Sequence, residues 1–190
     1  MGNPERGILN TGGAVMLALL FTVVLSAALA APAFLRARRA DKRGLILIAL
    51  AVLAALDIWV VQSPRMQVAV TTGGGLAKLA ILCVCGAKIG ALDVAFAVAL
   101  VAVFAALRGW HLGAAAALVQ VAAFAAGLAV ARLVALPLPG VVFIALGAMP
   151  FLWSTRKEWA EMPAGDKAST AVVCGLALVL ALAGAAKAIL

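Results

Sequence analysis

Uninterrupted apolar runs long enough to cross a lipid bilayer are the feature that most constrains this sequence. Residues 13–35 contain no charged side chain, and a helix of about 20 such residues spans the ~30 Å hydrocarbon core of a membrane. Further apolar runs occupy residues 44–61, 89–107, 112–136, 138–153 and 168–189, and a shorter run covers residues 73–87. We therefore predict an all-α, polytopic transmembrane helical bundle of about six or seven segments, forming one domain over residues 1–190.

The overall composition excludes an ordinary soluble fold. Hydrophobic residues make up 67% of the chain and charged residues 12%, whereas soluble domains average about 45–50% and about 25%. So few polar side chains cannot cover the surface of a water-soluble domain of this length. The lipid bilayer is therefore the first partner that the sequence predicts.

The short run at residues 73–87 has two interpretations. Its apolar part, residues 76–87, covers only about 18 Å as a helix, against a hydrocarbon core of ~30 Å. Lys78 and Lys88 bracket it, and both could extend their ammonium groups toward a water interface. The segment is either a short span or a re-entrant half-helix, and the sequence does not decide between them.

A basic cluster after the first run sets the expected orientation. By the positive-inside rule this cluster is cytoplasmic, so the amino terminus lies outside. We expect its side chains to contact anionic lipid headgroups in a bacterial inner (cytoplasmic) membrane. The formal net charge of +8 is explained in this way, and we expect no nucleic-acid partner. The cluster consists of Arg36, Arg38, Arg39, Lys42 and Arg43.

Ionisable residues inside the apolar runs are the best functional candidates, because burying a charge in a membrane is costly. Helical rise places Asp57 and Lys78 together in the outer half of the membrane, and Asp93 and Arg132 together near the inner boundary. We predict two ion pairs, Asp57–Lys78 and Asp93–Arg132. They either lock neighbouring helices together or line a path for a proton, an ion or a polar substrate.

Small residues and cysteines provide weaker signals. Gly86-x-x-x-Gly90 has the spacing that lets membrane helices pack closely, within the bundle or against a partner. Cys83, Cys85 and Cys174 lie in apolar runs without a C-x-x-C motif, and His111 is the single histidine. We therefore expect neither a metal site nor a cofactor.

Three short stretches, at residues 35–39, 72–79 and 138–147, occur in an order that resembles a known family. They are similar to the basic turn, the glycine-rich second motif and the late proline-glycine span of the small prepilin peptidases (family A24, the bacterial Tad-pilus type). The resemblance implies a membrane aspartic peptidase with two catalytic carboxylates on the cytoplasmic face. The two catalytic positions are occupied here by Phe34 and Leu76, which cannot transfer a proton.

Three functions follow as hypotheses. The first is a non-catalytic membrane subunit or assembly factor that binds other membrane subunits or copies of itself, since no Walker loop, zinc-protease or serine-hydrolase motif occurs. The second is a small transporter or channel that uses Asp57 or Asp93. The third is a divergent relative of the prepilin peptidases, which would require Asp41 and Asp93 to converge on one water. The missing catalytic motifs argue against an enzyme.

Overall fold

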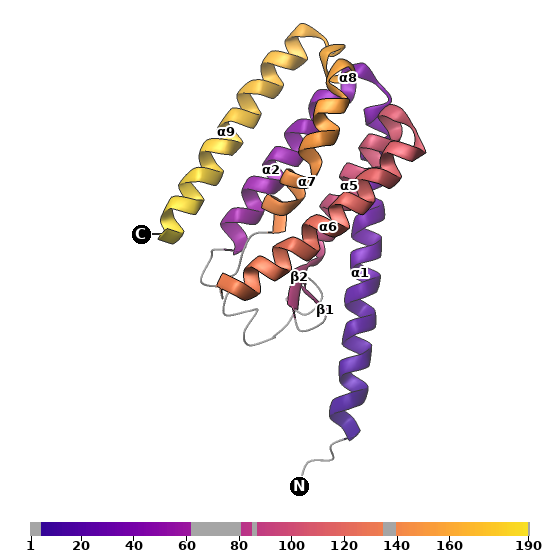
Figure 1. The fold of residues 1–190 in the computed structure, drawn as a ribbon, viewed down its shortest axis with the longest axis vertical. Helices are drawn as coiled ribbons and strands as arrows, with labels where there is room; N and C mark the ends of the chain where they lie inside the picture. Colours follow the sequence, from indigo (N-terminus) through magenta and orange to yellow (C-terminus); the bar gives the residue numbers. More distant parts are fainter. Residues whose placement is uncertain (1–4, 62–80, 85–86, 135–139, 190) are drawn as a thin grey trace.

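The computed structural model describes residues 5–61, 81–84, 87–134 and 140–189, and these form a bundle of long helices with one short hairpin (Figure 1). The long helices coincide with the apolar runs, because in lipid a helix satisfies all its backbone groups within the segment. They are α1 (Glu5–Ala37), α2 (Arg43–Val61), α5 (Ala91–Arg108), α6 (Trp110–Val134), α7 (Gly140–Ser154) and α9 (Ala164–Ile189). Shorter elements are η1 (Ala40–Lys42), β1 (Ile81–Val84), β2 (Ala87–Gly90) and α8 (Arg156–Ala160).

The predicted mainly helical class is confirmed, whereas the predicted count of six or seven spans is not. Within the described residues, four helical stretches are long and apolar enough to cross a membrane. Helix α7 is apolar but shorter, with fifteen residues. The four stretches are Val15–Ala37, Ala91–Arg108, Trp110–Val130 and Ala164–Gly184.

The predicted helical segment at residues 73–87 is wrong where the structure describes it. Residues 81–84 pair antiparallel with residues 87–90, with Ile81 opposite Gly90 and Val84 opposite Ala87. Residues 73–80, 85 and 86 lie outside the described part of the chain. The apolar run is short and rich in β-branched and small residues, so length and hydrophobicity alone did not separate a strand from a helix.

Helix α5 and the later helices run in the opposite direction to the one that the sequence analysis predicted. Helix α5 begins at the end of the bundle where α2 finishes, beside β1 and β2, and we call this the hairpin end (Figure 1). The opposite, basic end holds the α1–α2 turn, the α5–α6 turn at Gly109 and the α7–α9 connection with α8 (Figure 1). Gly109 has φ +87°, a conformation that glycine adopts without a steric penalty.

Helices α1 and α5 pack side by side through stripes of small residues. On α1, Ala18, Thr22 and Ser26 are buried at four-residue intervals. On α5, the buried residues Ala91, Ala95 and Ala99 repeat the same spacing. Small side chains at i and i+4 let two backbones approach closely, which is how membrane helices gain dispersion energy.

The core of the bundle lies between α5, α6 and α7. Phe104 and Phe151 stack with ring centroids 5.4 Å apart, and Ile144 beside them is fully buried. Helix α2 contributes only partly buried residues, such as Leu50 and Leu53, to this cluster. Helix α9 packs against α2 and lies at the edge of the bundle (Figure 1).

Candidate functional site

A pair of buried carboxyl groups joins α2 to α5 near the hairpin end. Asp57 lies in the last two turns of α2, and Asp93 is the third residue of α5. Each residue is only 8% exposed, and their side chains are hydrogen-bonded to each other. An ionised carboxylate has no proton to donate, so this hydrogen bond requires one shared proton between the two groups.

The local sequence of α5 explains the position of Asp93. The backbone N–H of Gly90, the residue before the helix, donates a hydrogen bond to the Asp93 carboxyl group. An acidic residue at the third helical position that bonds back to the capping residue satisfies one of the free N–H groups of a helix start. The helix dipole at this terminus also favours the negative charge of the carboxylate.

Glycine at the start of α7 makes room for the Asp93 carboxyl group. A Cβ atom built on Gly140 would lie 2.5 Å from Oδ2 of Asp93 and 3.3 Å from Oδ1, closer than van der Waals contact allows. The amino termini of α5 and α7 therefore both lie beside this carboxyl group, and both present the positive ends of their dipoles to it.

Each carboxyl group of the pair has one oxygen without a partner. Oδ2 of Asp57 and Oδ1 of Asp93 are buried and accept no hydrogen bond in the described part of the chain. One helical turn further into the bundle along α7, Gln120 of α6 donates to the Ile144 carbonyl at 3.1 Å, and its own Oε1 is also buried without a partner. The bundle interior thus offers acceptor oxygens, which suit a proton or another hydrogen-bond donor.

The structure corrects the depths that the sequence analysis assigned to the two aspartates. They were expected in opposite halves of the membrane, yet they are in contact, because α5 begins at the end of the bundle where α2 finishes. Their predicted cationic partners are not placed. Lys78 and the side chain of Arg132 lie outside the described residues, so the pairs Asp57–Lys78 and Asp93–Arg132 remain predictions.

The predicted convergence of Asp41 and Asp93 on one water is wrong. Asp41 lies in η1 at the basic end, where it is exposed and pairs with Lys42 at 3.4 Å. Asp93 contacts Asp57, which lies more than ~20 Å further along α2 at the helical rise. The acidic residue that meets Asp93 is therefore one that the resemblance did not suggest.

A second polar cluster holds the basic end together around Arg43. Its Nε donates to the Ala37 carbonyl at 3.0 Å, and Nη1 reaches the Glu158 carbonyl and the Glu161 carboxylate. The Arg43 side chain is 9% exposed, so the predicted lipid contact is wrong for this residue. It turns inward because the α1–α2 turn and α8 present carbonyl groups that need a donor.

Arg108 at the end of α5 reaches the same region. Its Nε lies 2.5 Å from Oε1 of Glu158, which places Glu158 between α5 and the connection to α9. The hydrogen bond from Arg108 lowers the pKa of the Glu158 carboxyl below its ordinary value. Four of the five residues of the predicted lipid-contact cluster are exposed at this end: Arg36, Arg38, Arg39 and Lys42.

The predicted glycine packing motif does not lie on a helix. Gly90 ends β2 and caps α5, and Gly86 lies outside the described residues. Cys83 belongs to strand β1, and Cys174 on α9 packs toward the Leu47 carbonyl of α2. In the ranges that the structure describes, no three His, Cys, Asp or Glu side chains gather in a way that could hold a metal ion.

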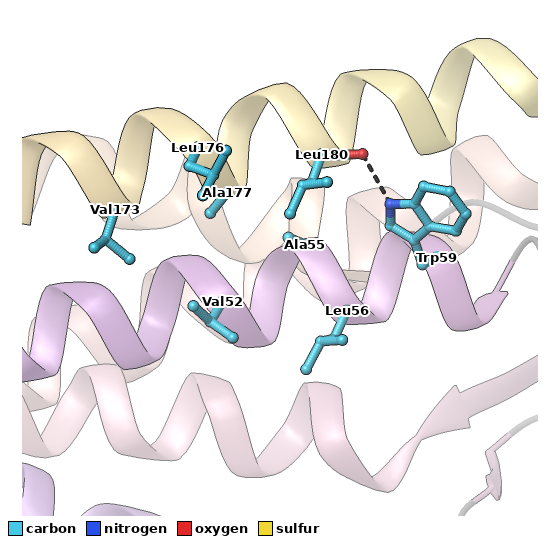
Figure 2. A pocket seen from close by; sticks show the side chains of 8 residues that line it. All are labelled: Val52, Ala55, Leu56, Trp59, Val173, Leu176, Ala177 and Leu180. Carbon is cyan, nitrogen blue, oxygen red and sulfur yellow. Dashed lines mark hydrogen bonds between the residues drawn. The ribbon is translucent and has the colours of Figure 1, made fainter.

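An apolar cavity of about 310 Å³ lies between α2 and α9 (Figure 2). Its walls are aliphatic side chains such as Val52, Leu56 and Leu176. The Trp59 indole closes one end and donates to the Leu180 carbonyl at 2.8 Å (Figure 2). The lining offers no charged or catalytic group, so this cavity adds no chemistry to the carboxyl pair.

Comparison with known proteins gives no relative for this arrangement. The chain matches no protein-family model, no curated protein and no solved structure. The carboxyl pair and the Arg43 cluster therefore carry the functional argument by themselves.

Proposed function

We propose that this protein is a small membrane transporter or channel in which Asp57 and Asp93 bind a transported or coupled proton. The single observation that supports this most directly is the hydrogen bond between two carboxyl groups buried among apolar helices. Such a pair holds one proton jointly and resists double ionisation, because like charges at contact distance repel strongly. Titratable groups inside membrane helices are typical of proton paths.

The proposal includes a six-helix topology in a bacterial inner membrane. If α1, α2, α5, α6, α7 and α9 all cross the bilayer, every connection at the basic end lies on the same side, and the positive-inside rule makes that side cytoplasmic. The amino terminus and the carboxyl pair then lie toward the outside. The connections at the basic end carry the cations Arg36, Arg38, Arg39, Lys42, Arg43, Arg108, Arg156, Lys157 and Lys167, against the acids Asp41, Glu158, Glu161 and Asp166.

Proton binding fits the pair better than hydrolysis does. A peptidase needs a water held between its two carboxylates and a substrate beside them. Here the carboxyl groups contact each other directly, and both residues are buried. The pair also lies opposite the basic end, whereas the peptidase resemblance implies a site on the cytoplasmic side. A proton needs neither a cleft nor a substrate pocket.

Two measurements on purified protein in lipid test the proposal. Infrared difference spectroscopy should detect the carbonyl stretch of a protonated carboxyl group in the wild type, and the band should disappear in Asp57→Asn/Asp93→Asn. In proteoliposomes with an imposed potassium diffusion potential, a pH-sensitive dye should report proton uptake by the wild type. The double variant should fall to the rate of protein-free vesicles.

Asp41→Asn is the matched control, because it also removes one carboxylate but from an exposed site at the basic end. It should keep both the infrared band and the proton flux. Equal flux in the wild type and the double variant would show that the pair carries no proton, and the pair would then serve only to join α2 to α5.

A membrane subunit is the second candidate, supported by the free face of α9. Gly175 on this face has no heavy atom within 4 Å of a built Cβ, and Val172 and Val179 beside it are exposed. Glycine among aliphatic residues is typical of helix–helix contacts in membranes. Mild-detergent purification of the tagged chain from native membranes, followed by mass spectrometry, should then yield stoichiometric partners. A lone monomer would count against this candidate.

A further inference from the structure

We propose that helices α2 and α9 form an arm that swings away from the other helices at the hairpin end when the Asp57–Asp93 pair loses its proton. The arm would pivot at the Arg43 cluster, which stays closed. This inference rests on the proposed proton binding by the pair, but it does not require that the proton is transported.

The packing divides the described helices into two units. Helix α1 packs on α5, the helices α5, α6 and α7 pack on one another, and α9 packs mainly on α2 (Figure 1). Between the units, α2 meets the main core through Leu50, Leu53 and Ala54, which are all only partly buried. A weakly packed, apolar boundary of this kind allows one unit to slide or rotate against the other.

The two units are tied differently at their two ends. At the basic end, Arg43 bonds to the Ala37 carbonyl of α1, and to the Glu158 carbonyl and the Glu161 carboxylate after α7. Ile46, one turn further along α2, is fully packed against Ala37 and Val103. These contacts fix the start of α2. Because they lie at one end of α2, a small rotation about them would move the other end of the helix most.

At the hairpin end, Asp57 and Asp93 form a hydrogen bond that joins the two units. With one proton the pair attracts, and with none it holds two negative charges in contact in a medium of low dielectric constant. Proton loss therefore changes the interaction between α2 and α5 from attraction to repulsion. Asp93 keeps its hydrogen bond from the Gly90 N–H and its position beside Gly140.

Few charged residues belong to the described elements that surround the pair. Helix α7 has no ionisable residue, and the other charged residues of α2 and α5, Arg43 and Arg108, lie at the basic end. Lys88 on β2, Arg132 on α6 and Lys187 on α9 are cationic residues of neighbouring elements toward the hairpin end. A cation in contact with the pair would keep it closed after proton loss, and the experiment below detects that outcome directly.

The length of the arm sets the size of the motion. From Arg43 to Asp57 the helix extends about 21 Å at its normal rise, so a rotation of about 10° moves Asp57 by about 4 Å. Pulsed electron spin resonance between spin labels resolves a change of this size. The native cysteines Cys83, Cys85 and Cys174 are first replaced by alanine.

Three label pairs in lipid nanodiscs test the motion. Labels at the exposed positions Leu56 on α2 and Val142 on α7 measure the distance between the two units at the hairpin end. The exposed Arg39 and Lys157 report the basic end, and Leu56 with Leu182 reports the arm itself. When the pH rises from about 4 to about 9, a range wide enough for shifted carboxyl groups, the first distance should grow by about 4 Å while the other two stay constant.

The variant Asp57→Asn tests whether proton loss from the pair causes the change in distance. Its amide stays neutral and can still donate a hydrogen bond to the Asp93 carboxylate. The variant should keep the short distance at every pH, and Asp41→Asn should open as the wild type does. An unchanged hairpin-end distance in the wild type, or an equal change in Asp57→Asn, overturns the proposal. If Asp57→Asn does not fold, Asp93→Asn provides the same comparison, with the constant basic-end distance as evidence of folding.

The outcome separates this motion from the proposed function. Aspartate-dependent proton flux with a fixed distance would retain the function and refute the swinging arm. A pH-dependent distance without proton flux would retain the arm and refute transport.

Discussion

Asp57 on α2 and Asp93 on α5 are hydrogen-bonded to each other, although a hairpin separates their helices along the chain. The contact forms because α5 begins, directly after β2, at the end of the bundle where α2 finishes. It places two acidic side chains together among apolar helices, where a buried carboxylate is energetically costly. Two carboxylates in contact repel each other, and a proton bound between them would remove that repulsion.

The first prediction concerns the stability of this pair. Asp57→Leu leaves the Asp93 carboxyl group buried without its side-chain partner and should lower the free energy of unfolding by about 1–3 kcal/mol. Asp57→Asn should cost less, because the amide still donates a hydrogen bond. In a double-mutant cycle, Asp57→Leu/Asp93→Leu should destabilise less than the sum of the single changes. Thermal unfolding in detergent measures all four proteins, and strictly additive effects would contradict the contact.

The second prediction concerns the glycine that faces Asp93. Gly140→Ala places a methyl group 2.5 Å from Oδ2 of Asp93, so it should destabilise the protein by about 1–3 kcal/mol through overpacking. Gly175→Ala, in open space on α9, should be neutral or stabilise by up to about 1 kcal/mol, because alanine favours a helix. The difference in melting temperature between these two variants is the measurement, and an equal response would show that Gly140 does not contact the carboxyl group.

The third prediction concerns Arg43 at the basic end. Arg43→Met removes the donor for the Ala37 and Glu158 carbonyls and leaves them unpaired. We expect a loss of about 2–4 kcal/mol in the free energy of unfolding. Arg39→Met, at an exposed position in the same turn, should change stability by less than about 0.5 kcal/mol. Similar losses in both variants would indicate a general effect of charge at this end.

The fourth prediction is a pH dependence from Glu158. Its pKa is lower in the folded protein because Arg108 hydrogen-bonds to the carboxylate. The stabilisation is therefore fully present above the pKa of glutamate in the unfolded chain, and it disappears as the pH falls through the lowered folded pKa. Wild type should exceed Glu158→Gln in melting temperature near neutral pH, and the difference should vanish in strong acid. A difference that persists or grows in acid would contradict this assignment.

Much of the helical framework could be predicted from local patterns. The run at residues 112–136 predicted α6 (Trp110–Val134), and the run at residues 44–61 predicted α2 (Arg43–Val61), each within two residues at both ends. Hydrophobicity and length suffice for such elements, because a chain in lipid has to satisfy its backbone within each segment. The segment at residues 73–87 could not be assigned in this way, since short apolar runs fit a strand as well as a helix.

The sequence identified the two residues of the candidate site but did not predict that they are in contact. Asp57 and Asp93 stood out because ionisable residues are rare inside apolar runs. The predicted partners of the two aspartates depended on how many segments cross the membrane between them. The sequence analysis counted one crossing too many, and this placed the aspartates in opposite halves of the membrane. Arg43 was grouped with its neighbours by charge alone. Nothing in its local sequence indicated that carbonyl groups from α1 and α8 would draw it inward.

The sequence by itself determined the solvent in which this protein folds, the long helices and the residues whose charge the membrane makes costly, because each depends only on nearby composition and segment length. The tertiary structure alone decided that the two aspartates are in contact, that Gly140 lies against one of them, and that Arg43 joins two connections at the basic end. These contacts join residues far apart in the chain, so they follow from how the helices pack and from the end of the bundle at which each helix begins.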